Sequence, residues 1–364
     1  AALAAMRFHP LTVAQVRPET DDTVSVSFRV PDDLRDEYRF TQGQHLTLRR
    51  EFNGEEVRRS YSICTSVYEN DLRVAVKAIP QGVFSGFVHQ ALATGDQIEV
   101  GLPIGHFNVP LDPGNHKRYA AFAAGSGITP VISIIKTTLS AEPHSAFSLV
   151  YGNRETRSII FREELESLKN SYLDRLSVTH ALSREGRNIP LLDGRIDHSK
   201  ASQLLDTLLV PEHFDEFFLC GPKGMIDGVR DALIEKGVDR SRIHFELFTA
   251  PDQAFELSGS RRTDPATQSG SHSTVVVSLE GKSTTLSMGP DDGSVLEAVR
   301  RVRPEVPYAC EGGVCATCRA RIIEGRVDMQ LNFALEEQEV EAGYVLTCQA
   351  VPASDHIVLD FDAL

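Results

Sequence analysis

The sequence lacks any long apolar run. No stretch approaches the roughly 18 consecutive apolar residues that a membrane-spanning helix needs. The opening segment, Ala1 to Met6, is also too short and too weakly apolar for an export signal. We therefore interpret Met6 as the natural start, leave the five preceding residues out of the fold reasoning, and expect a cytoplasmic protein that does not enter the membrane.

Positive charge is scarce as well. The chain has 37 Lys and Arg against 51 Asp and Glu, a formal net charge of −14, which argues against a nucleic-acid surface. The acidity is concentrated near the end, because residues 270–364 carry 15 acidic and 7 basic side chains. This excess is compatible with ordinary solubility. It is also compatible with a docking face for a partner protein that has basic patches.

Cysteines are few, and their distribution argues against a disulfide framework. In a secreted chain six cysteines would suggest disulfides. Here no export signal is found and four of the six lie close to the C-terminus, so a metal site in a reducing cytoplasm is the better interpretation. The six are Cys64, Cys220, Cys310, Cys315, Cys318 and Cys348.

The length of 364 residues predicts two or three domains. Residues 6–113 contain short alternating strands, such as Thr23–Val30 and Leu72–Lys77, which indicate an antiparallel β-barrel. Residues 114–250 alternate apolar strands with helices, the pattern of a doubly wound α/β domain with a parallel sheet. We thus expect a barrel followed by an α/β layer.

The remaining third of the chain predicts a linker and a small third domain. Residues 251–273 are rich in Ser, Gly, Thr, Gln and Arg and lack periodicity, which is typical of a flexible linker. Residues 274–364 begin with a hairpin signal around Glu280–Lys282, and a short helix from Ser294 to Val302 follows. A small sheet with one crossing helix is a β-grasp pattern.

The strongest chemical signal is the spacing of the late cysteines. Cys310, Cys315 and Cys318 are separated by four and then two residues, and Cys348 follows after 29 more. This is the ligand spacing of plant-type [2Fe–2S] clusters. We expect Gly312 and Gly313 to allow positive φ angles and a close approach of the loop to the cluster. The alternative, a structural zinc site, usually shows two separated cysteine pairs.

The segment from Pro307 to Cys318 resembles the cluster loop of plant-type ferredoxins. The whole chain resembles the ferredoxin–NADP reductase superfamily with a fused C-terminal ferredoxin. That resemblance implies electron transfer from NAD(P)H through a flavin to the cluster.

The resemblance also assigns a flavin site. Arg59-Ser-Tyr61-Ser62 matches the flavin motif of the superfamily, which implies that Arg59 pairs with the flavin phosphates, Tyr61 lies against the ring and Ser62 hydrogen-bonds near the reactive N5. A guanidinium fork suits phosphate, and an aromatic face suits the ring. Further residues expected at this site are Val76, Lys77, Gly82, Phe84, Ser85 and Phe248.

A glycine directly before the start of a helix, as at Gly82–Ser85, lets the backbone amides of the helix N-terminus bind a phosphate. This turn resembles the pyrophosphate contact of FAD-type relatives, so we expect FAD, with FMN as the alternative. Cys64 follows the motif and is interpreted as a small buried apolar residue.

A second glycine turn predicts the nicotinamide site. Gly125-Ser-Gly127-Ile-Thr129-Pro130 follows an expected strand and opens an expected helix, Thr129–Leu139. In the superfamily this motif receives the nucleotide phosphates. The later tripeptide Cys220-Gly221-Pro222 resembles the one beside the nicotinamide, and we name Ser62 and Cys220 as catalytic candidates.

The choice between NADPH and NADH depends on a loop after a strand. Ser183 and Arg184 resemble the superfamily's site for the 2′-phosphate of NADPH, and Arg154 is a second candidate. The alternative is that these residues are ordinary charged or polar loop residues exposed to solvent, without a role in binding the nucleotide. We expect NADPH.

Several segments further resemble reductases that serve di-iron oxygenases. They include Gly43–Leu48, Gly194–Asp197 and Gly343–Ala350. The resemblance implies subunits of a multicomponent di-iron oxygenase as electron acceptor. Two alternatives stay open: an NADH-dependent reductase of a Rieske-type aromatic-ring oxygenase, and a flavin and iron–sulfur redox sensor without turnover.

Overall fold

A computed structural model of the chain describes residues 7–186, 188–248, 272–289, 292–335 and 337–363. The chain divides into two compact units. The larger comprises Pro10–Val57 and Tyr61–Phe248, and the other contains the C-terminal segment from Thr249. Among the described residues, no helix is both long and apolar enough to cross a membrane.

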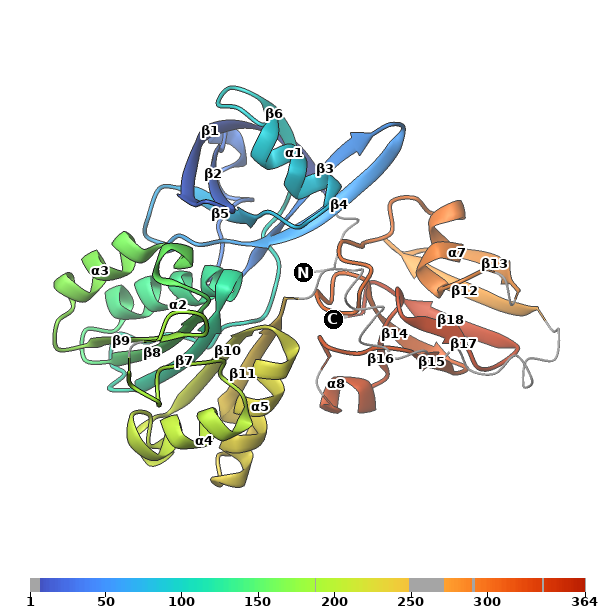
Figure 1. Cartoon of the computed structure of the whole chain (residues 1–364). Coiled ribbons are helices and arrows are strands. Elements are labelled where there is room, and N and C mark those ends of the chain that lie inside the picture. Colours follow the sequence, from blue (N-terminus) through green and yellow to red (C-terminus); the bar gives the residue numbers. More distant parts are fainter. Residues whose placement is uncertain (1–6, 187, 249–271, 290–291, 336, 364) are drawn as a thin grey trace. The chain divides into compact units, whose positions relative to one another are not determined.

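The N-terminal part is an antiparallel sheet that closes on itself (Figure 1). Its strand order is β4-β3-β6-β1-β2-β5. Ile63, directly after β4, pairs antiparallel with Val74 in β5, so the two outer strands meet and the barrel closes. The elements are β1 (Phe8–Thr20), β2 (Thr23–Arg29), β3 (His45–Phe52), β4 (Glu55–Ser62), β5 (Leu72–Lys77), α1 (Val83–Gln90) and β6 (Gln97–Gly101).

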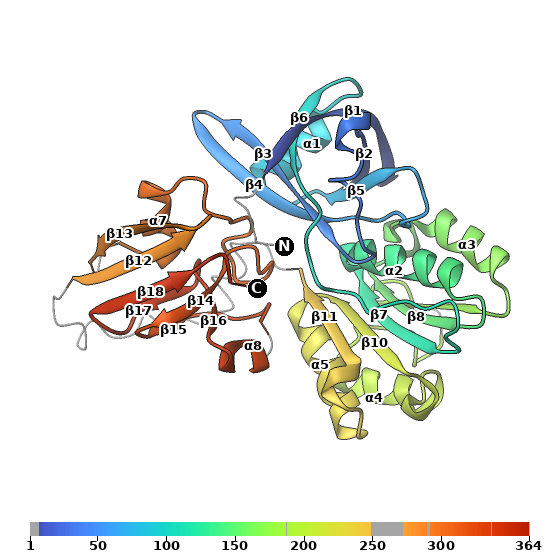
Figure 2. The same cartoon turned by 180° about the vertical axis from the view of Figure 1, so that it is seen from behind.

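A five-stranded parallel sheet follows, with the order β11-β10-β7-β8-β9. Helices α2 and α3 cover one face, and α4 and α5 cover the other (Figures 1 and 2). This is the doubly wound arrangement that the alternation of strands and helices predicts. The elements are β7 (Arg118–Ala124), α2 (Ile128–Ala141), β8 (Ala146–Asn153), α3 (Arg162–Ser171), β9 (Leu176–Leu182), α4 (His198–Thr207), β10 (Glu216–Gly221), α5 (Lys223–Glu235) and β11 (Ile243–Leu247).

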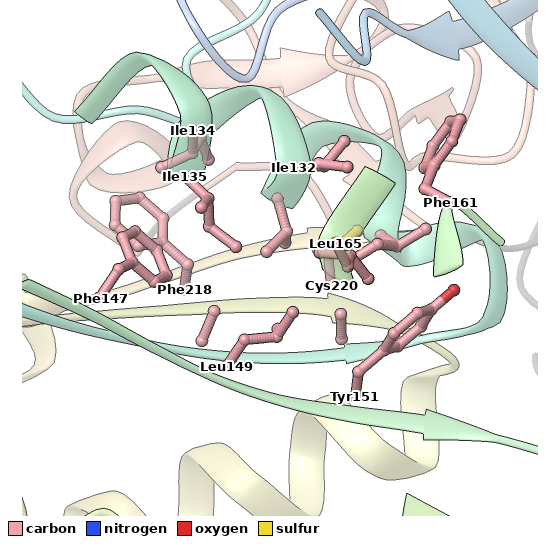
Figure 3. Packing of buried hydrophobic residues seen from close by; sticks show 14 of the residues in the cluster. Ile132, Ile134, Ile135, Phe147, Leu149, Tyr151, Phe161, Leu165, Phe218 and Cys220 are labelled. Atoms are coloured by element: carbon pink, nitrogen blue, oxygen red, sulfur yellow. The ribbon is translucent and has the colours of Figure 1, made fainter. Parts of the chain in front are cut away.

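Helix α2 is the centre of the core in this unit. Twelve of its fourteen residues are buried. Ile132 and Ile135 pack above Phe147 and Phe218 of the sheet (Figure 3). On another side of the helix, the Ser133 hydroxyl donates to the Thr65 carbonyl at 2.7 Å, beside the barrel. The helix is buried on nearly all sides because barrel and sheet enclose it together.

The expected helices are present, with shifted ends. The helix that we expect to start near Ser85, α1, begins two residues earlier at Val83, because the capping glycine is Gly82. Helix α4 is not anticipated by the sequence reasoning, although Asp197 is a strong start signal whose carboxylate accepts from the Lys200 amide at 2.9 Å. The helix is short and polar, so its apolar stripe is weak.

The C-terminal segment forms a five-stranded sheet in the order β13-β12-β18-β14-β16, with β12 and β18 parallel. Glu280 and Gly281 both have positive φ angles, as a two-residue hairpin turn requires. The elements are β12 (Ser273–Leu279), β13 (Lys282–Met288), α7 (Val295–Val302), β14 (Arg319–Glu324), β15 (Val327–Met329), α8 (Glu337–Glu341), β16 (Tyr344–Leu346), β17 (Ala350–Pro352) and β18 (His356–Asp360).

Two expectations for this segment need comment. The proposed linker, residues 251–273, lies almost wholly outside the described residues, and its last residue, Ser273, is already in β12. The short helix is confirmed: Ser294 accepts from the Glu297 amide, and the Glu297 carboxylate accepts from the Ser294 amide. This reciprocal pair explains why the helix begins where the sequence predicts.

Candidate flavin, nicotinamide and cluster sites

Strand β4 carries the three residues of the expected flavin motif near its C-terminal end. Arg59 and Tyr61 are half-buried, and Ser62 is buried. The Tyr61 ring lies 6.0 Å from the ring of Phe84, which is fully buried at the start of α1. The motif and the start of the helix are therefore brought together, although Tyr61 and Phe84 are far apart in sequence.

A cavity of about 740 Å³ opens beside the start of α1. Gly82 and Lys77 both line it, which suits a phosphate-bearing ligand, because Gly82 leaves the first amides of α1 without a side-chain cap. The lining residues are Asp22, Lys77, Ala78, Ile79, Pro80, Gln81, Gly82, Val83, Gly86, Phe87, His89, Gln90 and Arg154.

Ser85 and Val76, two of the residues expected to contact the flavin, hold the surrounding backbone in place through hydrogen bonds. The Ser85 hydroxyl accepts from the Ile79 amide at 3.2 Å and lies 3.3 Å from the Gly82 carbonyl, to which it donates. It thus holds the turn that precedes α1. Val76 is buried in β5, and its carbonyl lies 3.0 Å from Nε2 of His89. Both residues support the cradle through the backbone.

The sequence reasoning missed Glu246, which lies next to the flavin motif. Ser62 Oγ donates to Glu246 Oε2 at 3.1 Å, which links the end of β4 to β11. Glu246 is also in register with Cys220 of β10. An acidic residue two positions before Phe248, at the end of the last parallel strand, is the local signal that could have revealed it.

The glycine turn of the expected nicotinamide site lies at the carboxyl end of β7. A Cβ on Gly127 would come within 2.2 Å of the Cys220 carbonyl oxygen, so only glycine fits between the two strand ends. The Thr129 hydroxyl donates to the Ser126 carbonyl at 2.9 Å, and Tyr151 donates to Gly125 at the same distance. Pro130 lies in the first turn of α2. These contacts to the Gly125 and Ser126 carbonyls hold the turn in shape.

Cys220 is fully buried at the end of β10. Burial, and then the nearby Glu246 carboxylate, raise the pKa of its thiol well above the ordinary value. The thiol is therefore protonated, and Cys220 cannot serve as a thiolate nucleophile. The Phe248 amide donates to the Gly221 carbonyl at 3.4 Å, and Pro222 caps α5. The residues expected near the nicotinamide thus lie together.

The residues expected at the 2′-phosphate also meet. The amides of Ser183 and Arg184 donate to the carbonyls of Asn153 and Arg154, at 3.0 and 2.9 Å. Arg154 and Arg184 are both exposed, at the carboxyl ends of neighbouring strands β8 and β9. Arg154 also lines the cavity beside Lys77, a placement that the sequence did not indicate.

The four late cysteines gather as two pairs. The thiols of Cys310 and Cys315 hydrogen-bond each other, and those of Cys318 and Cys348 do the same. Within the described ranges, no three His, Cys, Asp or Glu side chains are placed around a single metal ion. Two pairs of thiols are the donor set that a core with two irons needs, so the residues fit a [2Fe–2S] cluster.

The backbone of this loop differs from the expectation in one respect. Gly313 has the expected positive φ of 74°, but Gly312 does not; Glu311 and Ala316, each at 52°, bend the loop instead. Gly312 contributes through its amide, which donates to Cys310 Sγ at 3.4 Å. The expectation for Gly312 was therefore wrong about its φ angle, because neighbouring non-glycine residues take the left-handed conformation.

Comparison with known proteins finds three matching domains. Residues 10–109 match the model of the oxidoreductase FAD-binding domain, residues 122–231 that of the oxidoreductase NAD-binding domain, and residues 277–353 that of the 2Fe-2S iron-sulfur cluster binding domain. Together the sites and matches define an oxidoreductase that binds FAD, a nicotinamide nucleotide and a [2Fe–2S] cluster.

Relatives that match over nearly the whole chain define the family. The chain is 44% identical over 356 residues, 98% of each chain, to a 1,2-phenylacetyl-CoA epoxidase subunit from Escherichia coli K12. It is 37% identical to the ferredoxin reductase component of 3-ketosteroid-9-alpha-monooxygenase from Rhodococcus rhodochrous, covering 96% of each chain. The solved structure of phthalate dioxygenase reductase is 26% identical, with a TM-score of 0.60 and coverage of 97% of this chain and 98% of that one.

The chain belongs to the family of flavin and iron–sulfur reductase components that supply oxygenases with electrons. Its electrons come from a nicotinamide nucleotide and pass through FAD and the [2Fe–2S] cluster to an oxygenase.

Proposed function

We propose that this reductase oxidises NADPH and delivers the electrons to a di-iron oxygenase that acts on phenylacetyl-CoA, in the breakdown of phenylacetate. The observation that supports electron transfer from the nucleotide to the flavin is the position of Glu246. It accepts a hydrogen bond from Ser62 and lies in register with Cys220. It joins the flavin motif to the nicotinamide motif. The acceptor is inferred from the 44% identity to the epoxidase relative, which extends over 98% of both chains.

Each motif has a defined task in this mechanism. Bound FAD would supply the change from two-electron hydride transfer to single-electron transfer, and a [2Fe–2S] cluster held by Cys310, Cys315, Cys318 and Cys348 would supply a one-electron carrier. Arg59, Lys77 and the first amides of α1 hold the FAD phosphates, while Tyr61 covers the ring. The turn at Gly127 and the protonated thiol of Cys220 place the nicotinamide beside that ring. Ser62 offers its hydroxyl at N5. Phe248 covers the remaining side of the ring.

The preference for NADPH is supported by the loop after β9. The Ser183 hydroxyl and the Arg184 guanidinium belong to the strand end where Arg154 also lies. Two guanidinium groups and a hydroxyl are suitable donors for a dianionic phosphate, and both arginines are exposed for it.

The test is an anaerobic titration of the holoenzyme. NADPH, or NADH in a parallel sample, is added while the flavin and cluster absorption are recorded, and phenylacetyl-CoA epoxidase subunits are added afterwards. The proposal predicts rapid bleaching by NADPH, slower bleaching by NADH, and reoxidation only in the presence of the oxygenase subunits, their substrate and dioxygen. Failure of those subunits to reoxidise the reductase would contradict the assigned acceptor.

A second candidate is favoured by the other relatives. The reductases of 3-ketosteroid monooxygenase and phthalate dioxygenase are examples of this architecture in the service of other oxygenases. The chain would then be an NADH-dependent reductase of a Rieske-type aromatic-ring oxygenase. A strong preference for NADH in the same titration would favour this interpretation over the first. A flavin and iron–sulfur redox sensor would instead reduce cytochrome c only slowly with either nucleotide.

A further inference from the structure

Glu311, the residue directly after Cys310, has an unusual backbone conformation. Its φ angle of 52° lies in the left-handed region, which glycine adopts readily and a residue with a long side chain adopts only with strain. Such strain persists only where the surrounding contacts hold the residue in place. In Glu311, both the side chain and the backbone carbonyl are held by hydrogen bonds.

The side chain of Glu311 is anchored to helix α7. Its carboxylate accepts a hydrogen bond from the Arg300 guanidinium. Arg300 is itself fixed, because Nη2 donates to the hydroxyl of Tyr308 at 2.7 Å and the guanidinium lies 3.8 Å from the centre of that ring. Tyr308 is buried, so a well-packed ring holds the arginine that holds Glu311.

The backbone of Glu311 is anchored to the residue after Cys348. The side-chain amide of Gln349 donates from Nε2 to the Glu311 carbonyl at 2.9 Å. The same nitrogen lies 3.8 Å from Cys348 Sγ. Gln349 is held at its own backbone, since its amide donates to the Leu346 carbonyl at 2.9 Å and its carbonyl accepts from the Gln330 amide at 2.8 Å. One side chain therefore bridges the two segments that carry the expected cluster ligands.

Gln349 lies across the loop at a point where Gly313 leaves room for it. A Cβ on Gly313 would lie 3.1 Å from Cγ of Gln349, which is a tight contact. Gly313 also has a positive φ angle of 74°. Both the conformation and the closeness of the Gln349 side chain therefore favour glycine at this position.

The hydrogen bond at the Glu311 carbonyl also orients the next amide. This carbonyl and the Gly312 N–H belong to one peptide group, and in a trans peptide they point in opposite directions. With the carbonyl directed at Gln349, the N–H is directed to the other side, where it donates to Cys310 Sγ at 3.4 Å. A hydrogen bond at one end of a peptide group polarises it and strengthens the bond at the other end.

We propose that Gln349 is a positioning residue that sets the reduction potential of the [2Fe–2S] cluster through the Glu311–Gly312 peptide, which Arg300 keeps in place. The inference rests on the proposed assignment of Cys310 and Cys348 as cluster ligands. A reduced cluster carries one more negative charge than an oxidised one, so N–H groups directed at its ligand sulfurs stabilise the reduced state more. Gln349 thus makes the cluster a better acceptor of electrons from the flavin.

The test compares Gln349→Met with Gln330→Met in the holoenzyme. Methionine keeps the length of the side chain over Gly313 and removes the amide donor. Gln330 is exposed and contacts Gln349 through its backbone amide, so the same substitution there leaves the bridge intact.

The midpoint potential is measured by a redox titration that follows the EPR signal of the reduced cluster, which counts only molecules that hold one. In Gln349→Met the equilibrium constant for cluster reduction should fall about tenfold, which is about 59 mV toward more negative potential for a one-electron couple. Gln330→Met should keep the wild-type potential.

Arg300 needs a separate comparison, because its substitution also removes a positive charge. Arg300→Gln leaves the Glu311 carboxylate without its partner, whereas the combination of Arg300→Gln with Glu311→Gln keeps the net charge of the wild type. The proposal predicts a lowered potential in both variants. A wild-type potential in the double variant would show that Arg300 only compensates charge, and would overturn its positioning role.

A second readout reports the hydrogen bonds to sulfur. Resonance Raman spectra of the oxidised holoenzyme record the iron–sulfur stretching bands, which should shift in Gln349→Met and keep their positions in Gln330→Met. An unchanged potential or unchanged bands in Gln349→Met would overturn the inference. Complete loss of the EPR signal would overturn it too, because Gln349 would then be required for holding the cluster. Full iron content in Cys348→Ser would instead show that the ligand assignment itself has failed.

Discussion

Arg73 Nη2 of β5 lies 3.2 Å from Glu164 Oε1 of α3, and this ion pair joins the barrel to the parallel-sheet layer. Lys136 of α2 also pairs with Glu164, and with Glu69 at 2.8 Å. The Lys136 side chain is 7% exposed and that of Arg73 is 10% exposed. Glu164 thus pairs with two nearly buried cations at the place where the flavin and nicotinamide layers meet, and Asp71 adds a second carboxylate 3.3 Å from Arg73 Nε.

The first prediction concerns this carboxylate. Glu164→Gln should lower the stability of the flavin and nicotinamide unit by about 2 to 3 kcal/mol, because it leaves two largely buried cations with less compensation. Urea unfolding followed by flavin release would measure the change. Glu166→Gln, in an exposed pair with Arg162 on the same helix, is the control and should change stability by less than about 0.5 kcal/mol. Equal effects of the two variants would contradict the interpretation.

The second prediction concerns the choice of nucleotide. Arg184→Ala should raise KM for NADPH about tenfold and leave KM for NADH unchanged, since a charge-assisted contact to the 2′-phosphate is worth about 1.4 kcal/mol or more. Steady-state kinetics with both nucleotides would show it. Arg157→Ala serves as control, because Arg157 is exposed nearby and pairs with Glu155.

Arg154→Ala gives a further comparison within the same experiment. Because Arg154 lines the cavity beside Lys77 as well, its loss should weaken FAD retention together with NADPH binding. An effect on NADPH alone would remove Arg154 from the flavin site.

The third prediction concerns the close contact between Gly127, in the expected nicotinamide turn, and the Cys220 carbonyl. Gly127→Ala should abolish measurable reduction by NADPH, because the added Cβ would lie 2.2 Å from the Cys220 carbonyl and separate the strand ends. Gly224→Ala on α5 is the control, since a Cβ there meets nothing within 4 Å. Reduction rates and nucleotide affinity by titration would distinguish them. Normal affinity in Gly127→Ala would show that the turn does not contact the nucleotide.

The fourth prediction separates the two redox centres. Cys348→Ser should remove the visible absorption of the cluster and electron delivery to the oxygenase, while hydride reduction of the flavin continues. Cys64→Ala should keep both centres, because burial raises the pKa of Cys64 to about 12 and the protonated thiol only packs in the core and donates to the Arg73 carbonyl at 3.3 Å. Iron and acid-labile sulfide analysis, with flavin absorption, measures the outcome. Full iron content in Cys348→Ser would refute the assigned ligand set.

The fifth prediction concerns pH. Burial, and then His106, lower the pKa of His45 to about 4 in the folded chain, from about 6.5 when unfolded, so the unfolded chain binds this proton first as the pH falls. The contribution of neutral His45 to the free energy of unfolding is therefore intact above about pH 6.5. It is lost progressively toward about pH 4, by up to about 3 kcal/mol. Melting temperatures of wild type and His45→Gln should diverge in slope over this range. The exposed His198→Gln variant should follow the wild-type slope.

Much of the site could be predicted from short segments. The cluster loop, the Arg59–Ser62 motif and the turn from Gly125 each place several functional groups within a few residues, so their spacing alone indicates the chemistry. The strand Leu72–Lys77 was also predicted with its observed bounds. Helix α4 was missed because it is short and polar, and Gly312 was assigned a φ angle that Glu311 and Ala316 take instead.

The sequence by itself determined the three cofactor types and the order of the layers, because ligand spacing and apolar periodicity are local properties of the chain. Only the tertiary structure decided that Glu246 meets Ser62, which is 184 positions away, and that His45 lies behind it. It likewise placed Arg154 at the cavity beside Lys77. No local pattern encodes such contacts, since they depend on how the barrel and the parallel sheet pack around helix α2.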